Sequence, residues 1–119
     1  IKRLAYSARV YRLPLSHTIE ELMEACRHVV RSNALKACYL RQLVFLGYGE
    51  MGISAPHQKS ETVIAAFPWG AYLGEEGMKS GVDACISSWR RLAPDTMPAG
   101  VKAAGNYLSS RLIALEARE

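Results

Sequence analysis

The sequence predicts a mixed fold of helices and strands, of the α/β or α+β class. Three segments have apolar residues at helical spacing, and three others are short runs of branched and aromatic residues near glycine or proline. Helices come first, strands follow, and a strand, a loop and a helix close the chain. This order excludes a helical bundle.

Two helices are predicted in the first third of the chain. From Ile1 to Arg12, apolar residues recur at intervals of three and four, and Pro14 limits the extension of this helix. Further along, Thr18 and Glu21 have the spacing of a capping box, in which two residues at a helix start bond to each other's backbone. A second helix is therefore expected over residues 19–31.

A strand is expected over residues 37–46, because aromatic and branched residues crowd together there and Gly47 to Gly49 close the run. Strand side chains alternate between two faces. One face would carry Tyr39, Arg41, Leu43 and Phe45, and the other Cys38, Leu40, Gln42, Val44 and Leu46. An arginine on the first face is out of place in a plain hydrophobic core.

The rest of the chain alternates between loops, strands and one helix. A loop is expected over residues 51–60 and an apolar strand over residues 61–67. The charged residues 74–81 indicate a linker, and residues 82–89 indicate a third strand. After an irregular segment with proline and glycine, a final helix is expected over residues 104–118.

The composition indicates enough chain for one modest hydrophobic core. The 119 residues carry 15 Lys and Arg against 11 Asp and Glu, a net charge of +4, and 50% of them are apolar. These values exclude a disordered or fibrous chain, and no apolar run approaches the roughly 20 residues of a membrane helix. The surplus positive charge forms no basic run, so we expect anionic small molecules as ligands, with no nucleic acid and no membrane as partners.

The cysteines and histidines indicate a reduced, cytoplasmic protein without a metal site. Cys26, Cys38 and Cys85 are odd in number and lack the spacing of metal ligands or of a disulfide framework. We interpret all three as small buried apolar residues. The three histidines are scattered, so neither a metal site nor a Cys/His catalytic pair is expected.

Lys102 is the candidate reactive amine among the five lysines. It follows an irregular segment, precedes small residues that let another group approach the backbone closely, and stands five positions before Tyr107. Because an ordinary lysine is protonated at neutral pH, a nucleophilic one needs an apolar setting or a cationic neighbour. On spacing alone, a solvated lysine near a helix start is the alternative.

Two long segments carry a family resemblance. Between Ser87 and Leu108 the chain contains SSWRR, APDTMP and KAAGNYL, and residues 66–74 are AFPWGAYLG. In order and in register, these segments resemble the branched-chain amino acid aminotransferases, fold-type IV enzymes that use pyridoxal 5'-phosphate, and the similarity extends over essentially the whole chain. The resemblance implies transfer of an amino group between leucine, isoleucine or valine and 2-oxoglutarate.

The same resemblance implies three residues around the cofactor. Lys102 corresponds to the lysine that forms the internal aldimine and later moves a proton between the substrate's alpha carbon and the cofactor's C4′ atom. Tyr107 corresponds to the tyrosine that hydrogen-bonds the cofactor's phenolic oxygen. Arg3 lies off the apolar stripe of its helix and corresponds to the arginine that holds the phosphate, with a plain surface arginine as the alternative.

Six further residues are implied on the substrate side. Tyr39 and Arg41 share a strand face, and their counterparts face the substrate, where the arginine accepts the side-chain carboxylate of glutamate. Four residues would form the apolar wall of the pocket or, alternatively, ordinary packing: Met51, Ile53, Trp69 and Tyr72. The chain departs from the family at Gln42, where a proline is frequent; by alternation Gln42 points away from the pocket, so this departure concerns local rigidity.

The implied fold is a part of a fold-type IV aminotransferase. Residues 1–72 would form most of the small α/β lobe, residues 73–80 the connector, and residues 81–119 the start of the cofactor-binding large lobe. We expect a piece of a longer chain, because no candidate is found for the glutamate that bonds the cofactor's pyridine nitrogen. Exposed apolar strand edges should make the piece associate with itself or require the rest of the protein, and we also expect a homo-oligomer.

Two functions remain open from the sequence. In the first, the chain is a segment of a branched-chain aminotransferase that is active when intact, and the 119-residue piece alone has no turnover. In the second, it is a free-standing remnant that acts as an interaction or cofactor-binding module. A D-amino acid transaminase or a lyase of the same fold type is less favoured, because the Trp69 to Tyr72 segment and the Tyr39 and Arg41 pair look like the branched-chain group.

Overall fold

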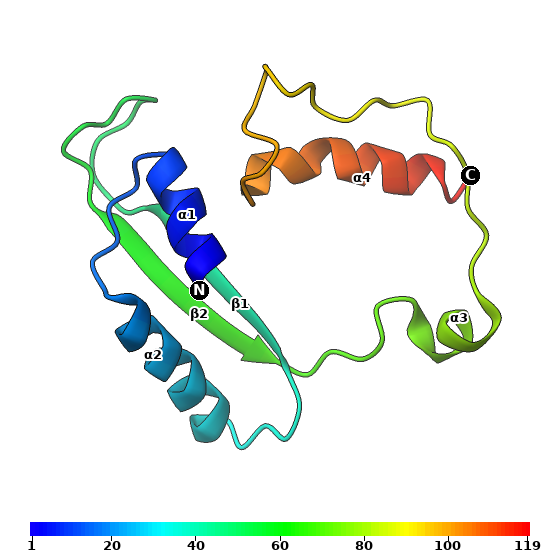
Figure 1. The fold of residues 1–119 in the computed structure, drawn as a ribbon, viewed down its shortest axis with the longest axis horizontal. Coiled ribbons are helices and arrows are strands. Elements are labelled where there is room, and N and C mark those ends of the chain that lie inside the picture. The colour runs from blue at the N-terminus through cyan, green and yellow to red at the C-terminus, as the bar shows by residue number, and fades with distance from the viewer. The chain divides into compact units, whose positions relative to one another are not determined.

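The computed structural model describes residues 1–119 and confirms the predicted mixture of helices and strands (Figure 1). In chain order the elements are α1 (Lys2–Val10), α2 (Ile19–Ser32), β1 (Tyr39–Leu46), β2 (Ser60–Phe67), α3 (Gly74–Ser80), the 3-10 helix η1 (Ala104–Asn106) and α4 (Tyr107–Glu116). They divide into two compact units, unit 1 over Ile1–Trp69 and unit 2 over Gly70–Glu119. No helix is both long enough and apolar enough to span a bilayer.

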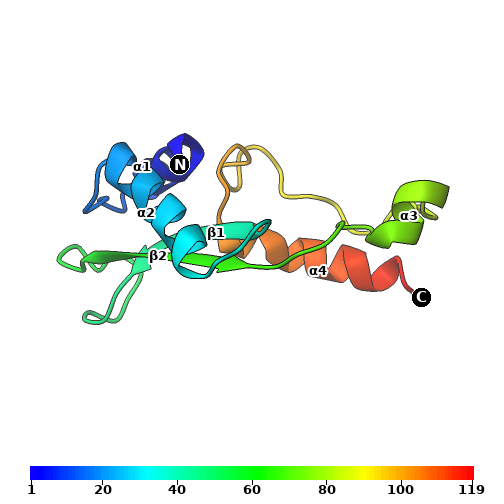
Figure 2. The ribbon, with the colours of Figure 1, turned by 90° about the horizontal axis from the view of Figure 1, so that it is seen from below.

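Unit 1 is a two-stranded antiparallel sheet with two helices on one of its faces. Tyr39 pairs with Phe67 at one end of the ladder, and Leu46 pairs with Ser60 at the other. Figure 2 shows α1 and α2 on the same side of β1 and β2. Within unit 1, the opposite face of the sheet is therefore left open.

The predicted alternation along β1 is confirmed. From Tyr39 to Val44, exposed and half-buried residues alternate strictly, with Arg41 among the exposed ones. Gln42 lies on the helix-covered face, where its Nε2 atom is 3.5 Å from the Sγ atom of Cys26 in α2. The residue that departs from the family pattern therefore links the strand to the helix that covers it.

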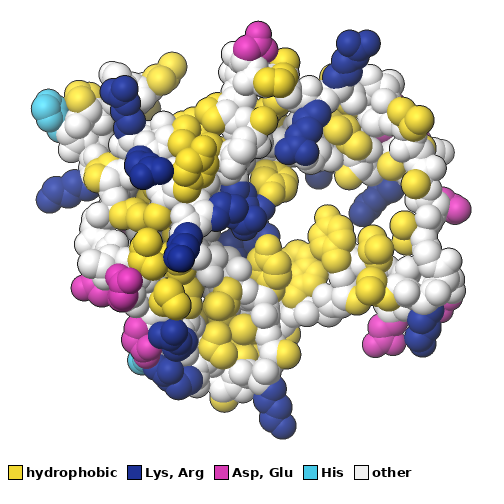
Figure 3. Space-filling model, in the orientation of Figure 1, with side chains coloured by type: hydrophobic (Ala, Val, Ile, Leu, Met, Phe, Trp, Pro, Cys, Tyr) yellow, Lys and Arg dark blue, Asp and Glu magenta, His cyan; other side chains and the backbone are white.

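Few apolar side chains are buried. They are Ala8, Leu22, Cys26, Ala55 and Val101, of which only Val101 belongs to unit 2. Large hydrophobic side chains lie instead on the surface of both units (Figure 3). Such exposed apolar surface is typical of contact with another segment or chain, so self-association stays a prediction.

The capping box at the start of α2 is confirmed. The backbone N–H of Glu21 donates to Thr18 Oγ1 at 3.1 Å, and the backbone N–H of Thr18 donates to Glu21 Oε2 at 2.7 Å. Two hydrogen bonds from Thr18 hold the pKa of the Glu21 carboxyl below its ordinary value. The bond from the backbone N–H has the larger effect, and the bond from the hydroxyl the smaller. The charged carboxylate therefore stabilises this helix start.

The helices α1 and α2 end in the same kind of turn. Arg12 has φ 55° and Ala34 has φ 51°, both in the left-handed region. In each turn, the backbone N–H of the residue after the left-handed one donates a hydrogen bond to the helix carbonyl five residues earlier. The donor–acceptor distance is 2.9 Å after Arg12 and 3.3 Å after Ala34, as in a Schellman motif. Because Arg12 reverses the chain, α1 ends at Val10, earlier than the sequence predicts.

The structure of unit 2 differs from the predicted elements in two places. Residues 74–81 were expected to be a linker, and they contain the helix α3 (Gly74–Ser80), where two glutamates in the first turn and Lys79 in the last turn suit the helix dipole; their role as a connector between two lobes stays a prediction. The glycines at its first and fourth positions hide this helix from propensity arguments. Residues 82–89 form no strand, because the single sheet of the structure consists of β1 and β2 and offers this segment no pairing partner.

The prediction of three buried cysteines is right only for Cys26. Cys38 is half-buried and Cys85 is exposed. Cys85 lies in the segment that was expected to be a strand, and without a sheet around it this segment has nothing to cover its side chains. All three cysteines are free thiols.

Candidate active site

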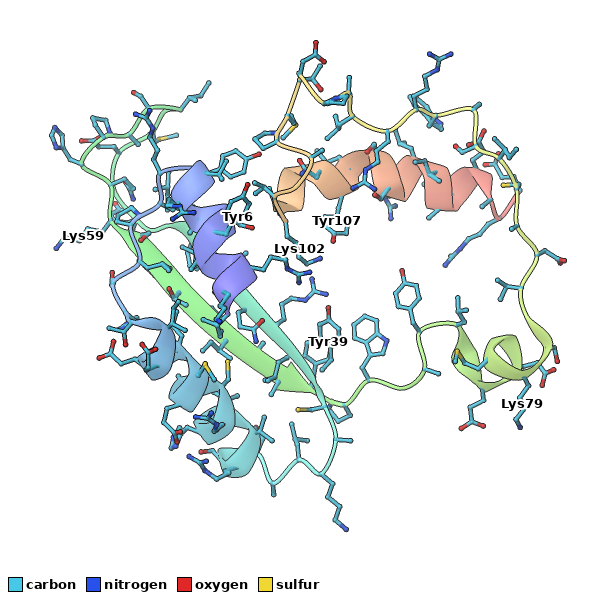
Figure 4. All side chains as sticks on the ribbon, viewed as in Figure 1. Tyr6, Tyr39, Lys59, Lys79, Lys102 and Tyr107 are labelled. Carbon is cyan, nitrogen blue, oxygen red and sulfur yellow. The ribbon has the colours of Figure 1, made fainter.

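Lys102 and Tyr107 come together in unit 2 at the start of α4 (Figure 4). Tyr107 is the first residue of α4, and the 3-10 turn η1 separates it from Lys102. This turn brings the two side chains to the same side, so that Lys102 Nζ donates a hydrogen bond to Tyr107 Oη. The Nζ atom also lies 4.5 Å from the centroid of the tyrosine ring, a cation–π distance. A primary amine and a phenol therefore meet at an exposed point of the chain.

The residues on both sides of Lys102 fix its backbone. Val101 is 5% exposed, and its N–H donates to the carbonyl of Pro98 at 3.0 Å. Asn106 reaches back from η1, where its Nδ2 atom donates to the carbonyl of Val101 at 3.2 Å. The Oδ1 atom of Asn106 is buried and accepts no hydrogen bond within the chain. A buried acceptor without a partner in the chain therefore lies one residue before Tyr107.

Three aromatic rings gather at one end of the sheet in unit 1. The ring centroids of Tyr39, Phe67 and Trp69 lie 5.4 to 5.6 Å from one another, with interplanar angles of 37° to 45°. Tyr39 and Phe67 are cross-strand partners, and Trp69 follows two residues after the end of β2. These spacings are in the range of favourable aromatic pairs, so the three rings form one apolar wall.

Arg41 adds a positive charge to this wall. Its Cζ atom lies 5.4 Å from the centroid of the Tyr39 ring. Its cross-strand partner is Ala65, whose side chain is a single methyl group. The open face of the sheet therefore carries a group that can bind a carboxylate next to rings that can pack against an aliphatic chain.

Phe67 is a member of this cluster that the sequence reasoning missed. The strands expected over residues 37–46 and 61–67 differ in length, and their lengths alone do not align them. In the structure, β1 and β2 each have eight residues and pair end to end, so that the last residue of β2 lies opposite Tyr39. The signal that could have placed Phe67 is that consecutive strands usually pair.

The other predicted site residues are not brought to these two clusters within their own units. Arg3 is exposed on α1. Met51 and Ile53 are fully exposed, at 100% and 105%, so they cover neither Tyr39 nor Arg41 within unit 1. Tyr72 belongs to unit 2 and is 88% exposed. Their roles in a pocket stay predictions.

The loop that carries Met51 and Ile53 is held at its base by Gln58. This side chain is buried; its Nε2 atom donates to the carbonyl of Gly47, and its Oε1 atom accepts the N–H of Glu50 at 2.5 Å. Gly49 lies between them with φ 151°, and a Cβ atom there would be 2.7 Å from Gln58 Oε1. The side-chain amide of Gln58 therefore closes the base of the loop and leaves no space for a side chain at Gly49.

The far end of α4 carries a carboxylate with several donors. Glu116 accepts a hydrogen bond from the hydroxyl of Ser87, and the backbone N–H of Ser88 lies 3.0 Å and 3.2 Å from its two oxygens. These hydrogen bonds hold the pKa of Glu116 below its ordinary value, and the bond from Ser87 has the largest effect. We call these three residues the Glu116 clasp.

All 119 residues match the protein family described as amino-transferase class IV. The chain belongs to this family. The match confirms the family resemblance seen in the sequence. Among curated relatives, the branched-chain-amino-acid aminotransferase of Escherichia coli (strain K12) is 54% identical over 119 residues, which are 99% of this chain and 38% of that protein.

Solved structures of the family agree in fold. The crystal structure of the Escherichia coli branched-chain amino acid aminotransferase matches with a TM-score of 0.95 and 52% identity, over 98% of this chain and 39% of that one. The T.th. branched-chain amino acid aminotransferase matches with TM-scores of 0.82 with pyridoxamine 5'-phosphate, at 37% identity, and 0.83 with N-(5'-phosphopyridoxyl)-L-glutamate, at 36%. These matches cover 98% of this chain and 39% and 36% of the respective chains. The chain thus spans less than half the length of these relatives.

Proposed function

We propose that this chain is the part of a branched-chain amino acid aminotransferase that carries the cofactor lysine. The observation that carries the proposal is the contact between Lys102 and Tyr107 in a chain 54% identical to such an enzyme. The cofactor is proposed to be pyridoxal 5'-phosphate, because one related structure holds its amine form and another holds its phosphopyridoxyl adduct with glutamate.

The residues present fit this cofactor. A lysine amine can bond an aldehyde, a phenol can donate to a ring oxygen, and a guanidinium can bond two phosphate oxygens at once; we assign these tasks to Lys102, Tyr107 and Arg3. When bound, pyridoxal phosphate supplies a ring that withdraws electrons from the substrate's alpha carbon. Lys102 Nζ would hold the cofactor and then accept the proton that leaves this carbon.

On the substrate side, we propose that the open sheet face of unit 1 receives the substrate side chain. Arg41 would bind the distal carboxylate of glutamate or 2-oxoglutarate, and the rings of Tyr39 and Trp69 would pack against the aliphatic chains of leucine, isoleucine and valine. The contacts among these three residues support the assignment, because they place charge and apolar surface side by side. Met51, Ile53 and Tyr72 are proposed to complete the apolar wall in the intact enzyme.

Reductive labelling tests the cofactor assignment. The chain is incubated with pyridoxal phosphate, reduced with borohydride, digested and mapped by mass spectrometry. We expect the adduct at Lys102 to exceed those at the other four lysines. Lys79 is the matched control, because it is an exposed helical lysine of the same unit (Figure 4). Equal labelling of Lys102 and Lys79 would contradict the proposal, and Tyr107→Phe should reduce the preference while keeping the ring.

A turnover assay tests whether the 119 residues are active on their own. The chain spans 38% of its curated relative, so we predict no glutamate formation from leucine and 2-oxoglutarate by the 119 residues alone. Detectable turnover would contradict this prediction and exclude a remnant without catalysis. The predicted cytoplasmic location and homo-oligomeric state are part of the same proposal.

A further inference from the structure

We propose that Glu116 is a positioning residue for Lys102 and Tyr107. By binding residues 87–88, it fixes the C-terminal end of α4 within unit 2, and the rigid helix then holds Tyr107 at its other end against Lys102. This inference rests on the proposed function, since it concerns how the cofactor lysine and its phenol neighbour are kept in place.

The Glu116 clasp joins parts of the chain that are far apart in sequence. Ser87 and Ser88 precede Glu116 by 29 and 28 residues. The hydroxyl of Ser87 also accepts the N–H of Trp89 at 3.1 Å, so its hydrogen is directed to the carboxylate rather than back to the chain. Both oxygens of Glu116 are thereby engaged by donors from one short segment.

The position of Glu116 in the helix indicates that it serves this contact. It is the last residue of α4, and a negative charge there is opposed by the helix dipole. No basic residue in the last turn of α4 offsets that effect. Despite the dipole, the donors of Ser87 and Ser88 keep the pKa of Glu116 low, so the carboxylate is charged at neutral pH and its hydrogen bonds are charge-assisted.

Apolar packing does not fix α4 in this unit. None of its residues is buried, and Val101 is the single buried apolar residue of unit 2. A helix of 10 residues is a rod of about 15 Å. If its far end is released, its direction changes and Tyr107 moves with it. The polar clasp at Glu116 is therefore the device that sets the direction of the helix.

Four variants of the 119-residue chain test this role by the borohydride labelling described above. Glu116→Ala removes the acceptor, Glu116→Gln keeps one of its oxygens, and Ser87→Ala removes one donor without changing α4. Glu119→Gln is the matched control, since it makes the same charge change three residues later. The readouts are the ratio of labelling at Lys102 to Lys79, the hydrogen exchange rate of the Ser88 amide, and the unfolding midpoint.

We expect the labelling ratio to fall in the order wild type, Glu116→Gln, Glu116→Ala, by about 10- to 100-fold overall, the factor that corresponds to the loss of a hydrogen bond to a charged group. The Ser88 amide should exchange faster in the same order, and Glu119→Gln should match the wild type. If the midpoint falls while the ratio in folded protein stays at the wild-type value, Glu116 is merely structural and the inference is overturned. If Glu116→Ala does not fold, a wild-type ratio in Ser87→Ala overturns it.

The same labelling experiment distinguishes failure of the proposed function from failure of the positioning role. Equal labelling of Lys102 and Lys79 in the wild-type chain would remove the proposed function, and with it this inference. A wild-type preference for Lys102 that survives Glu116→Ala would leave the proposed function intact and remove only the positioning role.

Discussion

The substitution Leu22→Ala tests whether α2 holds the sheet of unit 1 in place. Its side chain is 3% exposed, and it is the largest of the buried apolar side chains. Replacing a buried leucine by alanine costs about 2–5 kcal/mol, depending on how far the neighbours collapse into the space. No large side chain of the protein is fully buried, so the surroundings can adjust. We therefore expect Leu22→Ala to lose about 2–3 kcal/mol of unfolding free energy.

Urea unfolding followed by far-ultraviolet circular dichroism measures this loss. Met23→Ala is the control, because its side chain is next in α2 and is 42% exposed; it should lose less than about 1 kcal/mol. Tyr39 lies on the open face of the sheet, so the near-ultraviolet signal of its ring cluster should be unchanged in folded Leu22→Ala. Equal losses in the two variants would refute the packing of α2 through Leu22.

Three other predictions concern the backbone and the charges. Ala34→Gly should raise stability by about 1 kcal/mol, because it relieves a side chain in the left-handed region; an unchanged urea midpoint would argue against strain there. Gly49→Ala should cost about 1–3 kcal/mol, because Gln58 occupies the space of the new Cβ atom, whereas Gly70→Ala, with open space around it, should be neutral. The lowered pKa of Glu21 means that its contribution is complete above the ordinary value of 4.5 and is lost as the pH falls below it; helix content should therefore fall less on acidification in Glu21→Gln than in the wild type.

The sequence predicted most of unit 1 because local signals and tertiary packing agree there. The capping box of Thr18 and Glu21 placed the start of α2 correctly, and alternation along β1 placed Tyr39 and Arg41 on one face. The end of α1 was missed because Arg12 adopts a left-handed turn without a glycine to indicate it.

Unit 2 was harder to predict because its structure depends less on local pattern. The apolar run 82–89 resembles a strand, but a strand needs a pairing partner, and unit 2 supplies none. The pairing of Lys102 with Tyr107 was suggested by resemblance, and its geometry depends on the η1 turn that brings them together. The Glu116 clasp could not be predicted, because nothing in the sequence relates a glutamate to serines 28 and 29 residues earlier.

The pairing of Arg41 with Ala65 has a consequence for how substrate choice could change. The residue opposite Arg41 on β2 is small. If the open face binds substrate as proposed, a larger residue at Ala65 would push Arg41 toward or away from the distal carboxylate without altering any side chain that touches it. Substitutions in β2 would then change the preference for dicarboxylate over aliphatic substrates. Only the last two residues of this strand belong to the recognised motifs.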